Sequence, residues 1–371
     1  MSADFKVEID RTSKVEWSAL LHGFADATIY QTWSYGAVRW GVNNLSHLVL
    51  KEGEEVVGLA QVSIKKIPFL EAGIAYIPWG PMWRSKDREN EISEFGEIIR
   101  ALKNEYAIRR GLLLRIAPNE IDGDDNKCTS ILESEGFVRR RQHYRTLLIE
   151  LSASMDELYK GLARRWKRAL KTAESKKLRV SEGDSEELFE ALNKLHKDMV
   201  SRKGFVPGVN IDEFRAIQKD LPETLKMKIM ICEYEGKPVS ALMASLIGNK
   251  GIGLIGGTGT VGLNLGGFHL LNWKMIEWMK SEGANWYDFG GYDPKGNPGT
   301  ASFKDGLPGQ DVFHIGQWET CTNQLSSSFV RLGEWGKNSA RAIHAKWDNL
   351  RKKPIKKESE SKIDANQKNH E

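Results

Sequence analysis

Hydrophobic residues recur along this chain at two spacings, one typical of helices and the other typical of strands. Residues 13–41 are predicted to form two short helices, because Trp17, Leu21 and Phe24 share one helical face and Thr32 is placed to cap a second helix. Apolar runs then predict three strands, a helix, a strand, a helix and a strand, at 48–51, 56–64, 73–79, 91–109, 112–116, 128–135 and a last strand ending at Leu151.

The second half of the chain repeats this plan. The segment 52–59 (EGEEVVGL) is echoed at 235–242 (EGKPVSAL), and an amphipathic helix at 268–280 again precedes a buried strand. An order of elements repeated about 180 residues apart predicts two copies of one domain. The predicted fold class is therefore α/β (α+β), with two domains that each have a mixed, mostly antiparallel sheet flanked by helices.

The expected domain boundaries follow from this repeat. The first domain is expected at 1–152 and the second at 153–322, the second including a basic helix at 155–175. Apolar residues at helical spacing predict a C-terminal amphipathic helix at 323–351. The last segment, 352–371, begins basic and becomes polar without aromatic residues, which predicts a disordered tail.

Composition narrows the class of protein. Of the 371 residues 40% are hydrophobic and 28% are charged, and the net charge is only +4. The mean hydropathy of −0.46 and the lack of a long apolar run predict a soluble protein without a membrane span. The first residues show no apolar signal region, so a cytoplasmic location is expected. The three cysteines and eight histidines show no ligand spacing, so neither a metal nor a tightly bound cofactor is predicted.

The basic residues gather in one segment. Nine residues from Lys160 to Arg179 are basic and only Glu174 is acidic, which favours a polyanion-binding surface over a merely solvated helix face. An exposed Trp166 would stack on a base. The pattern alone does not choose among RNA, lipid and a sugar nucleotide as the partner. The cations that would contact RNA, if RNA is the partner, are Arg164, Arg165, Lys167 and Lys171.

The stretch 285–306 (NWYDFGGYDPKGNPGTASFKDG) carries the densest chemistry. It begins as a strand that contains Asp288, breaks at Gly290, and continues as a loop from Asp293 to Lys304. A long loop after a buried strand is where α/β proteins often place a ligand site. An ordinary strand exit with solvated charges is the alternative.

Standard catalytic and nucleotide-binding motifs are missing from the sequence. It contains no P-loop, no GxSxG, no HExxH and no GxGxxG between a strand and a helix. The glycine-rich run from Gly256 to Gly267 precedes a helix. It would either present N–H groups to a phosphate or allow close packing of strand and helix.

Several short motifs, taken in order, resemble the FemABX family of non-ribosomal peptidyltransferases, which build peptidoglycan cross-bridges. The resemblance covers roughly residues 15–320 and implies two GNAT-like acyltransferase domains, in agreement with the repeat. The matching pieces are Gln31-Thr32-Trp33, Arg39, Gly80-Pro81, Lys167, Leu170, Ala173, Arg202-Lys203-Gly204-Phe205, Leu270-Leu271-Asn272-Trp273, Tyr287-Asp288-Phe289-Gly290-Gly291 and Phe303-Lys304-Asp305-Gly306.

The resemblance implies an acyltransferase that moves an aminoacyl group from an aminoacyl-tRNA to an amine of a peptidoglycan precursor. The amine attacks an ester directly, so positioning and charge stabilisation are needed rather than a protein nucleophile. Asp288 or Asp293 would orient the amine or accept its proton, or would act only as a structural cap. The resemblance also implies that Lys304 is the cation that stabilises the negative charge and that Phe303 shapes the pocket. Arg39 and Arg202 would bind the phosphates of the precursor.

Two alternatives stay open. Some family members carry a long coiled-coil arm that is interpreted as binding tRNA. Between Asp184 and Asp220 this chain lacks such an arm. A GNAT-type N-acyltransferase of exopolysaccharide or cell-envelope biosynthesis, using acetyl-CoA or another acyl-CoA, is therefore the second hypothesis. The third is a non-enzymatic protein that binds a polyanion or contacts the inner face of the plasma membrane through its basic segments. No DNA partner is expected.

Overall fold

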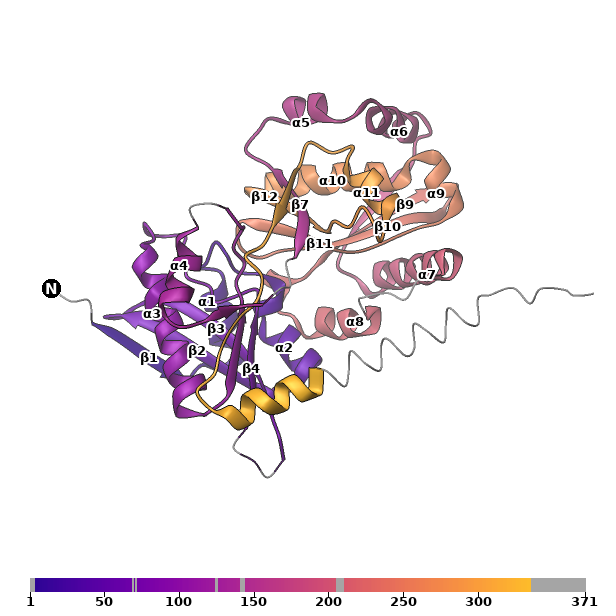
Figure 1. Ribbon diagram of the computed structural model, residues 1–371. Helices are drawn as coiled ribbons and strands as arrows, with labels where there is room; N and C mark the ends of the chain where they lie inside the picture. Colours follow the sequence, from indigo (N-terminus) through magenta and orange to yellow (C-terminus); the bar gives the residue numbers. More distant parts are fainter. Residues whose placement is uncertain are drawn as a thin grey trace, which may run out of the picture.

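Two seven-stranded sheets organise the computed structural model, which describes residues 4–68, 70, 72–123, 126–140, 144–204 and 210–334 (Figure 1). From edge to edge, the first sheet contains β1 (Phe5–Ile9), β2 (Leu45–Glu52), β3 (Glu55–Lys66), β4 (Gly73–Pro78), β5 (Leu113–Ala117), β14 (Trp318–Thr320) and β6 (Val138–Arg139). The second contains β8 (Arg179–Gly183), β9 (Lys228–Tyr234), β10 (Lys237–Leu246), β11 (Lys250–Thr258), β12 (Trp286–Gly291), β7 (Arg145–Glu150) and β13 (Gln310–Phe313). Neighbouring strands are antiparallel except β4 with β5 and β11 with β12, which confirms the predicted mixed sheets.

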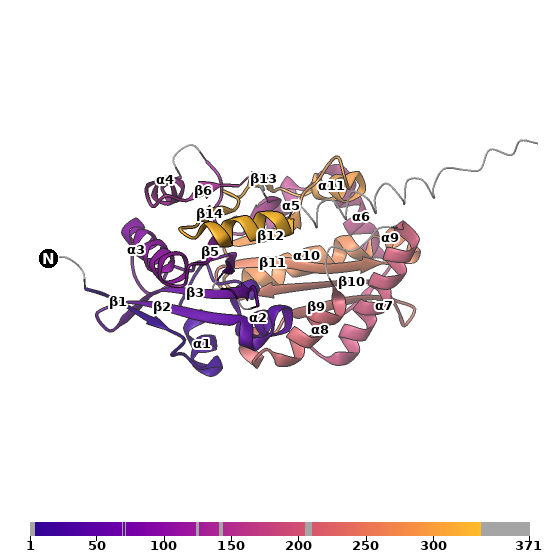
Figure 2. The ribbon, with the colours of Figure 1, turned by 60° about the horizontal axis from the view of Figure 1, so that its bottom comes forward.

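Helices cover both sheets, as the predicted class requires. They are α1 (Lys14–Leu21), α2 (Trp33–Trp40), α3 (Ile92–Leu102), α4 (Lys127–Ser134), α5 (Met155–Gly161), α6 (Arg164–Ser175), α7 (Glu186–Lys203), α8 (Ile211–Asp220), α9 (Thr260–Leu265), α10 (Gly267–Ser281) and α11 (Pro298–Lys304). Short 3₁₀ turns lie at Ile29–Gln31, Val42–Asn44 and Glu223–Leu225, and a π-helical turn extends α3 over Lys103–Arg109. Helices α7 and α8 pack on one face of the second sheet, and α5, α6 and α10 on the other (Figure 2).

The two sheets exchange one strand each. Strand β7 pairs with β12 and β13 in the second sheet, and β14 pairs with β5 and β6 in the first. The boundary expected at residue 152 would place Arg145–Glu150 in the first domain and Trp318–Thr320 in the second, whereas each strand lies in the other sheet. A short apolar segment predicts a strand but does not indicate which strand it pairs with, because strand pairing depends on packing in the folded protein.

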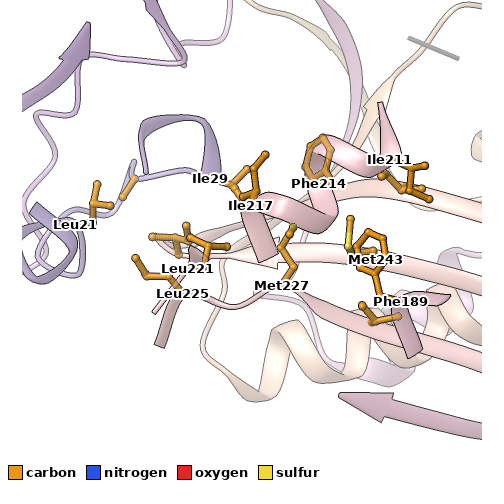
Figure 3. Close-up of a cluster of buried hydrophobic side chains, with 14 of the residues drawn as sticks. Leu21, Ile29, Phe189, Ile211, Phe214, Ile217, Leu221, Leu225, Met227 and Met243 are labelled. Atoms are coloured by element: carbon orange, nitrogen blue, oxygen red, sulfur yellow. The ribbon is translucent and has the colours of Figure 1, made fainter. Parts of the chain in front are cut away.

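A hydrophobic core between the sheets belongs to both domains. Val49 of β2 and Met243 of β10 lie in the same buried cluster, which α1, α7 and α8 complete. Figure 3 shows Ile29 of the first half together with Ile217 and Leu221 of the second. Because one core serves both sheets, the two domains stabilise each other.

Local sequence signals define most helix starts correctly. The side chain of Thr32 caps α2 by accepting a hydrogen bond from Tyr35 N (3.2 Å), and Ser185 caps α7 through Leu188 N (3.4 Å). The basic segment expected as one helix at 155–175 forms two, α5 and α6. The chain bends between them because Leu162 adopts an extended conformation (φ −63°, ψ 138°) and buries its side chain.

The chain returns to the first sheet at its described end. A helix at 324–334 lies against this sheet, where Ser326 Oγ donates to Gly111 O (2.7 Å) and Arg115 Nη2 contacts Glu334 Oε1 at 2.6 Å. The rest of the helix expected at 323–351 and the tail expected at 352–371 lie outside the described residues. No helix in the described part of the chain is long and apolar enough to span a membrane.

Candidate active site

The parallel strands β11 and β12 diverge, and a pocket of about 740 Å³ opens where they separate. They pair only from Lys250 to Ile252 on β11 and from Trp286 to Asp288 on β12. The equivalent strands of the first sheet, β4 and β5, stay paired over the whole length of β5. Beyond Asp288, β12 is no longer paired with β11, although it stays paired with β7 as far as Gly291, so the second domain has space for a ligand between its central strands.

The pocket wall is mostly apolar with a few polar groups, as is usual for small-molecule sites. Tyr287 and Phe289 line it from β12, while Phe303 and Lys304 line it from α11. The remaining wall comes from the end of α7, the β10–β11 hairpin, α9 and the start of α10, with Met199, Lys203, Leu242, Gly253–Thr258, Leu263, Phe268, Asn272 and residues 296–300.

The segment before Lys304, expected as a plain loop, contains the short helix α11. Asn297 caps it by accepting a hydrogen bond from Thr300 N (3.3 Å), and Pro298 occupies its first position, where a missing N–H costs nothing. Phe303 and Lys304 therefore reach the pocket from a helix end.

Lys304 is a buried cation whose hydrogen bonds are all made to the backbone. Its Nζ donates to the carbonyls of Phe289 (2.6 Å), Gly290 (2.8 Å) and Gly291 (2.9 Å). These carbonyls have left the ladder with β11, so Lys304 supplies donors that the sheet no longer provides. Burial lowers the pKa of Lys304 to about 8, while the negative charge of Asp288 opposes this shift.

The two candidate carboxylates act as turn acceptors. Asp288 lies on the face of β12 opposite to Tyr287 and Phe289, and its Oδ1 accepts hydrogen bonds from Gly290 N (2.7 Å) and the Thr146 hydroxyl. Asp293 is exposed, and its Oδ1 accepts from the N–H groups of residues 295 (3.2 Å) and 296 (2.9 Å). Neither side chain lines the pocket, so the structural-cap alternative fits the observed contacts of both.

The two candidate phosphate ligands lie at different places. Arg202, near the end of α7, donates to Thr258 O (2.8 Å), and both Lys203 and Thr258 line the pocket. Arg39 lies on α2 and forms an ion pair with Glu213 of α8. The structure thus places Arg202 beside the pocket and Arg39 at a contact between the two halves of the chain.

Helix α6 brings the predicted basic surface next to the pocket. Arg164, Arg165 and Lys171 are exposed and Lys167 is half-buried, and none of them forms an ion pair within the described residues. Arg165 donates to the carbonyl of Ser302, which directly precedes Phe303. A cationic surface without acidic partners therefore borders the wall that carries Phe303.

Trp166 is fully buried, so the expectation that it stacks on a base is wrong. Helical periodicity places Trp166, Leu170 and Ala173 on one face of α6, which packs on α10. The indole Nε1 donates to Phe303 O (3.2 Å), and its ring lies edge-on to His269 with centroids 4.7 Å apart. Trp166 supports the pocket wall from behind.

The glycine-rich run serves close packing. A Cβ on Gly257 would approach His196 N to 2.7 Å, and one on Gly266 would approach Ala169 O to 2.4 Å. Gly266 also has a φ of +74°, which favours glycine. The start of α10 is therefore packed against α6. This contact fits the interpretation that the glycine-rich run allows close packing, rather than the interpretation that it binds a phosphate.

Tyr287 and Phe289 line the pocket, a role that was not predicted for them although both belong to the motif at 287–291. The alternation in Tyr287-Asp288-Phe289 contains the signal, because successive strand residues point to opposite faces. The wall residues from α7 and α9 carry no comparable signal. No group of three or more potential metal ligands occurs within the described residues.

Comparisons with known proteins agree with this geometry. Residues 157–305, which include most of the pocket, match the sequence profile of the Acetyltransferase (GNAT) domain family. No curated protein matches the chain in sequence. A crystal structure of FemX is similar, with a TM-score of 0.72 and 17% identity over 87% of this chain and 99% of that chain.

Two further solved structures are less similar. One is the C-terminal domain of a proposed lysylphosphatidylglycerol synthetase from Agrobacterium fabrum, with a TM-score of 0.49 and 9% identity over 84% of this chain and 96% of that chain. The other is a tandem GNAT protein from the clavulanic acid biosynthesis pathway, with a TM-score of 0.44 and 11% identity over 85% and 98%. Residues 157–305 therefore match the GNAT acetyltransferase domain, in agreement with the predicted acyltransferase, and the fold of the chain is similar to that of FemX, in agreement with the predicted pair of GNAT-like domains.

Proposed function

We propose that this chain transfers an aminoacyl group from an aminoacyl-tRNA to an amine of a peptidoglycan precursor. The observation that carries the proposal is the hydrogen bond from Arg165 of α6 to the carbonyl of Ser302, which directly precedes the pocket residue Phe303. An acyl group in the pocket would be attached to a polyanionic carrier lying along α6. The expected class of acceptor comes from the resemblance of the sequence motifs to the FemABX family.

The extent of the basic surface favours a nucleic acid over coenzyme A as the carrier. The cations of α6 extend from Arg164 to Lys171, about 10 Å along the helix axis, which is more than one diphosphate requires. A coenzyme A diphosphate is usually bound by a free helix start, and the start of α10 is packed against Ala169. An acyl-CoA donor remains the second candidate because the apolar pocket would also accept a pantetheine arm.

The chemistry needs placement and charge more than a nucleophile. The amine attacks the ester carbonyl, the C–O bond to the tRNA breaks, and the developing oxyanion is stabilised by a nearby positive charge. We propose that Lys304 acts through its positive charge and by holding the end of β12, residues 289–291, in place. Phe303 shapes the pocket wall. Arg202 would bind a phosphate near the pocket, and Arg39 would do so only after leaving Glu213.

Purified protein incubated with charged tRNA and a UDP-muropeptide is expected to yield an extended peptide, detected by mass spectrometry. Lys304→Met should lower the rate at least 100-fold, the scale of losing one charge-stabilising group. Phe303→Ala should also lower the rate, because it removes part of the pocket wall. Lys295→Met, in the same loop but exposed, is the matched control and should retain the wild-type rate. Saturable binding of acetyl-CoA by calorimetry, together with no product from any charged tRNA, would overturn this function in favour of the acyl-CoA hypothesis.

A further inference from the structure

The hydroxyl group of Tyr287 is a polar group of the pocket between β11 and β12 that has no partner in the protein. Tyr287 is only 1% exposed and lines the pocket, with its ring packed on that of Phe289 (centroids 4.1 Å apart). Within the described residues the hydroxyl makes no hydrogen bond, yet it is not completely enclosed by protein. A buried hydroxyl of this kind is costly unless a ligand or water completes it.

The hydroxyl lies in the gap where β11 and β12 separate. A Cβ on Gly253 of β11 would be 3.3 Å from it, so a side chain at this position would crowd the hydroxyl. The Gly253 carbonyl lies 3.5 Å from the place of a Cβ on Gly290, and the carbonyl of Gly290 accepts from Lys304 Nζ (2.8 Å). The Tyr287 hydroxyl and the Lys304 ammonium group therefore both lie at this gap. A carbonyl oxygen is about as large as a water molecule, so it can reach the hydroxyl wherever water could touch it.

Lys304 has no N–H group left for a substrate in this arrangement. A protonated lysine has three donors, and those of Lys304 are directed to the carbonyls of residues 289–291. Its positive charge still acts on a nearby oxyanion, but charge alone does not fix the position of the oxyanion. A directed donor in addition to this charge would do so, since preorganised hydrogen bonds are a large part of such stabilisation.

Tyr287 is suited to this task because its hydroxyl stays protonated. Burial raises the pKa of Tyr287, and the negative charge of Asp288 adds to this shift. The uncharged polar side chains that are also buried in the pocket wall have partners in the protein. Thr258 shares a hydrogen bond with a serine hydroxyl (2.8 Å), and Asn272 Nδ2 donates to a carbonyl of its own helix (2.7 Å).

We propose that the Tyr287 hydroxyl donates a hydrogen bond to the carbonyl oxygen of the acyl group, and that this bond strengthens as the oxyanion develops. The nitrogen of the acceptor amine bonds to the carbonyl carbon, and the π electrons of the carbonyl move to its oxygen. When the carbonyl forms again, the bond from carbon to the carrier breaks, and the proton that the amine loses ends on the carrier. Tyr287 neither gains nor loses a proton.

This inference rests on the proposed acyl transfer, but not on which carrier delivers the acyl group. An ester of tRNA and a thioester of coenzyme A both present a carbonyl, and both react through an oxyanion. Tyr287 is therefore assigned to the acyl carbonyl, whereas the cations of α6 are assigned to the carrier. The two assignments can fail separately.

Steady-state kinetics of wild type and Tyr287→Phe test the inference, with charged tRNA and acetyl-CoA each offered as donor and a UDP-muropeptide as acceptor. The substitution keeps the ring and removes only the hydroxyl, so kcat should fall about 100-fold while the KM values stay close to those of wild type. The ratio of the two kcat values should be the same from about pH 6.5 to 9, because the hydroxyl keeps its proton in this range.

Tyr234→Phe is the matched control, because it removes a tyrosine hydroxyl from β9 of the same sheet, outside the pocket lining. It should keep the wild-type kcat. Thermal melts add a readout that does not depend on a donor. Tyr287→Phe should melt no lower than wild type, since the lost hydroxyl has no partner in the protein, and a lower melting temperature would contradict the inference.

The possible results separate the role of Tyr287 from the proposed function. An unchanged kcat in Tyr287→Phe, or a loss confined to KM, would overturn the role of Tyr287 and leave the proposed function in place. Product from acetyl-CoA alone would overturn the aminoacyl-tRNA function, and a lower kcat of Tyr287→Phe with that donor would still support the role of Tyr287. No product from either donor with wild type would overturn both.

Discussion

At the scale of the residue, Lys304 is both buried and positively charged, two properties that usually exclude each other. A buried ammonium group is unfavourable unless its N–H groups have partners, and here three carbonyls provide them. Those carbonyls point together only because β12 turns away from β11 after Asp288. Lys304 therefore stabilises the strand exit while it places a positive charge in the pocket wall.

The lowered pKa of Lys304 predicts the direction in which the stability of the protein changes with pH. Its pKa is about 8 in the folded protein against an ordinary value of 10.5, so between these pH values the unfolded state binds more protons. The free energy of unfolding should therefore rise with pH across this window, by about 3 kcal/mol relative to Lys304→Met, and the difference should be constant below pH 8. Urea denaturation of both proteins from pH 7 to 10.5 measures this, and parallel curves would contradict it.

At the scale of the element, helix α6 has two faces with separate tasks. Trp166, Leu170 and Ala173 bury one face against α10, and the other face presents cations to solvent. The buried face fixes the position of the cations relative to Phe303, since Trp166 donates to the carbonyl of that residue.

Under the proposed function, removing cations from α6 should lower the salt dependence of tRNA binding. Each lost phosphate contact reduces the slope of log K against log salt concentration by about 0.7–0.9. The triple variant Arg164→Ala, Arg168→Ala and Lys171→Ala should therefore reduce the slope by about 2–3. Filter binding between 50 and 300 mM salt, a range of about sixfold, measures the slope. The exposed pair Lys65→Ala and Lys66→Ala on β3 is the control, and an equal reduction there would contradict a specific surface.

At the scale of the whole molecule, the exchange of β7 and β14 links the two sheets. Trp318 of β14 is 1% exposed and belongs to the core of the first sheet, although it lies far along the chain. The core between the sheets adds a second link. Neither half of the chain contains all strands of its own sheet.

We therefore expect the chain to unfold as one cooperative unit. Far-UV circular dichroism and tryptophan fluorescence should report coincident urea transitions, because both sheets lose shared contacts together. A fragment of residues 1–152, which ends at the expected boundary, should not fold, since it lacks β14 and carries β7 without β12. Two separate transitions, or a folded and soluble 1–152 fragment, would contradict this expectation.

Most elements could be predicted from local patterns because local chemistry decides them. Thr32 caps its helix as expected, and the repeated order of strands and helices predicts two related sheets. The buried position of Trp166 was also readable from its helical spacing with Leu170 and Ala173, but the surrounding charges suggested exposure instead.

The sequence by itself determined the class of fold, the twofold repeat and the basic segment, and it indicated the stretch 285–306 as the candidate site. Only the tertiary structure decided where β7 and β14 pair, which groups satisfy Lys304, and that Tyr287 lines the pocket between β11 and β12. The physical reason is the distance along the chain over which each interaction acts. Periodicity and capping act between residues a few positions apart, whereas strand partners, buried charges and cavities depend on residues that only the folded chain brings together.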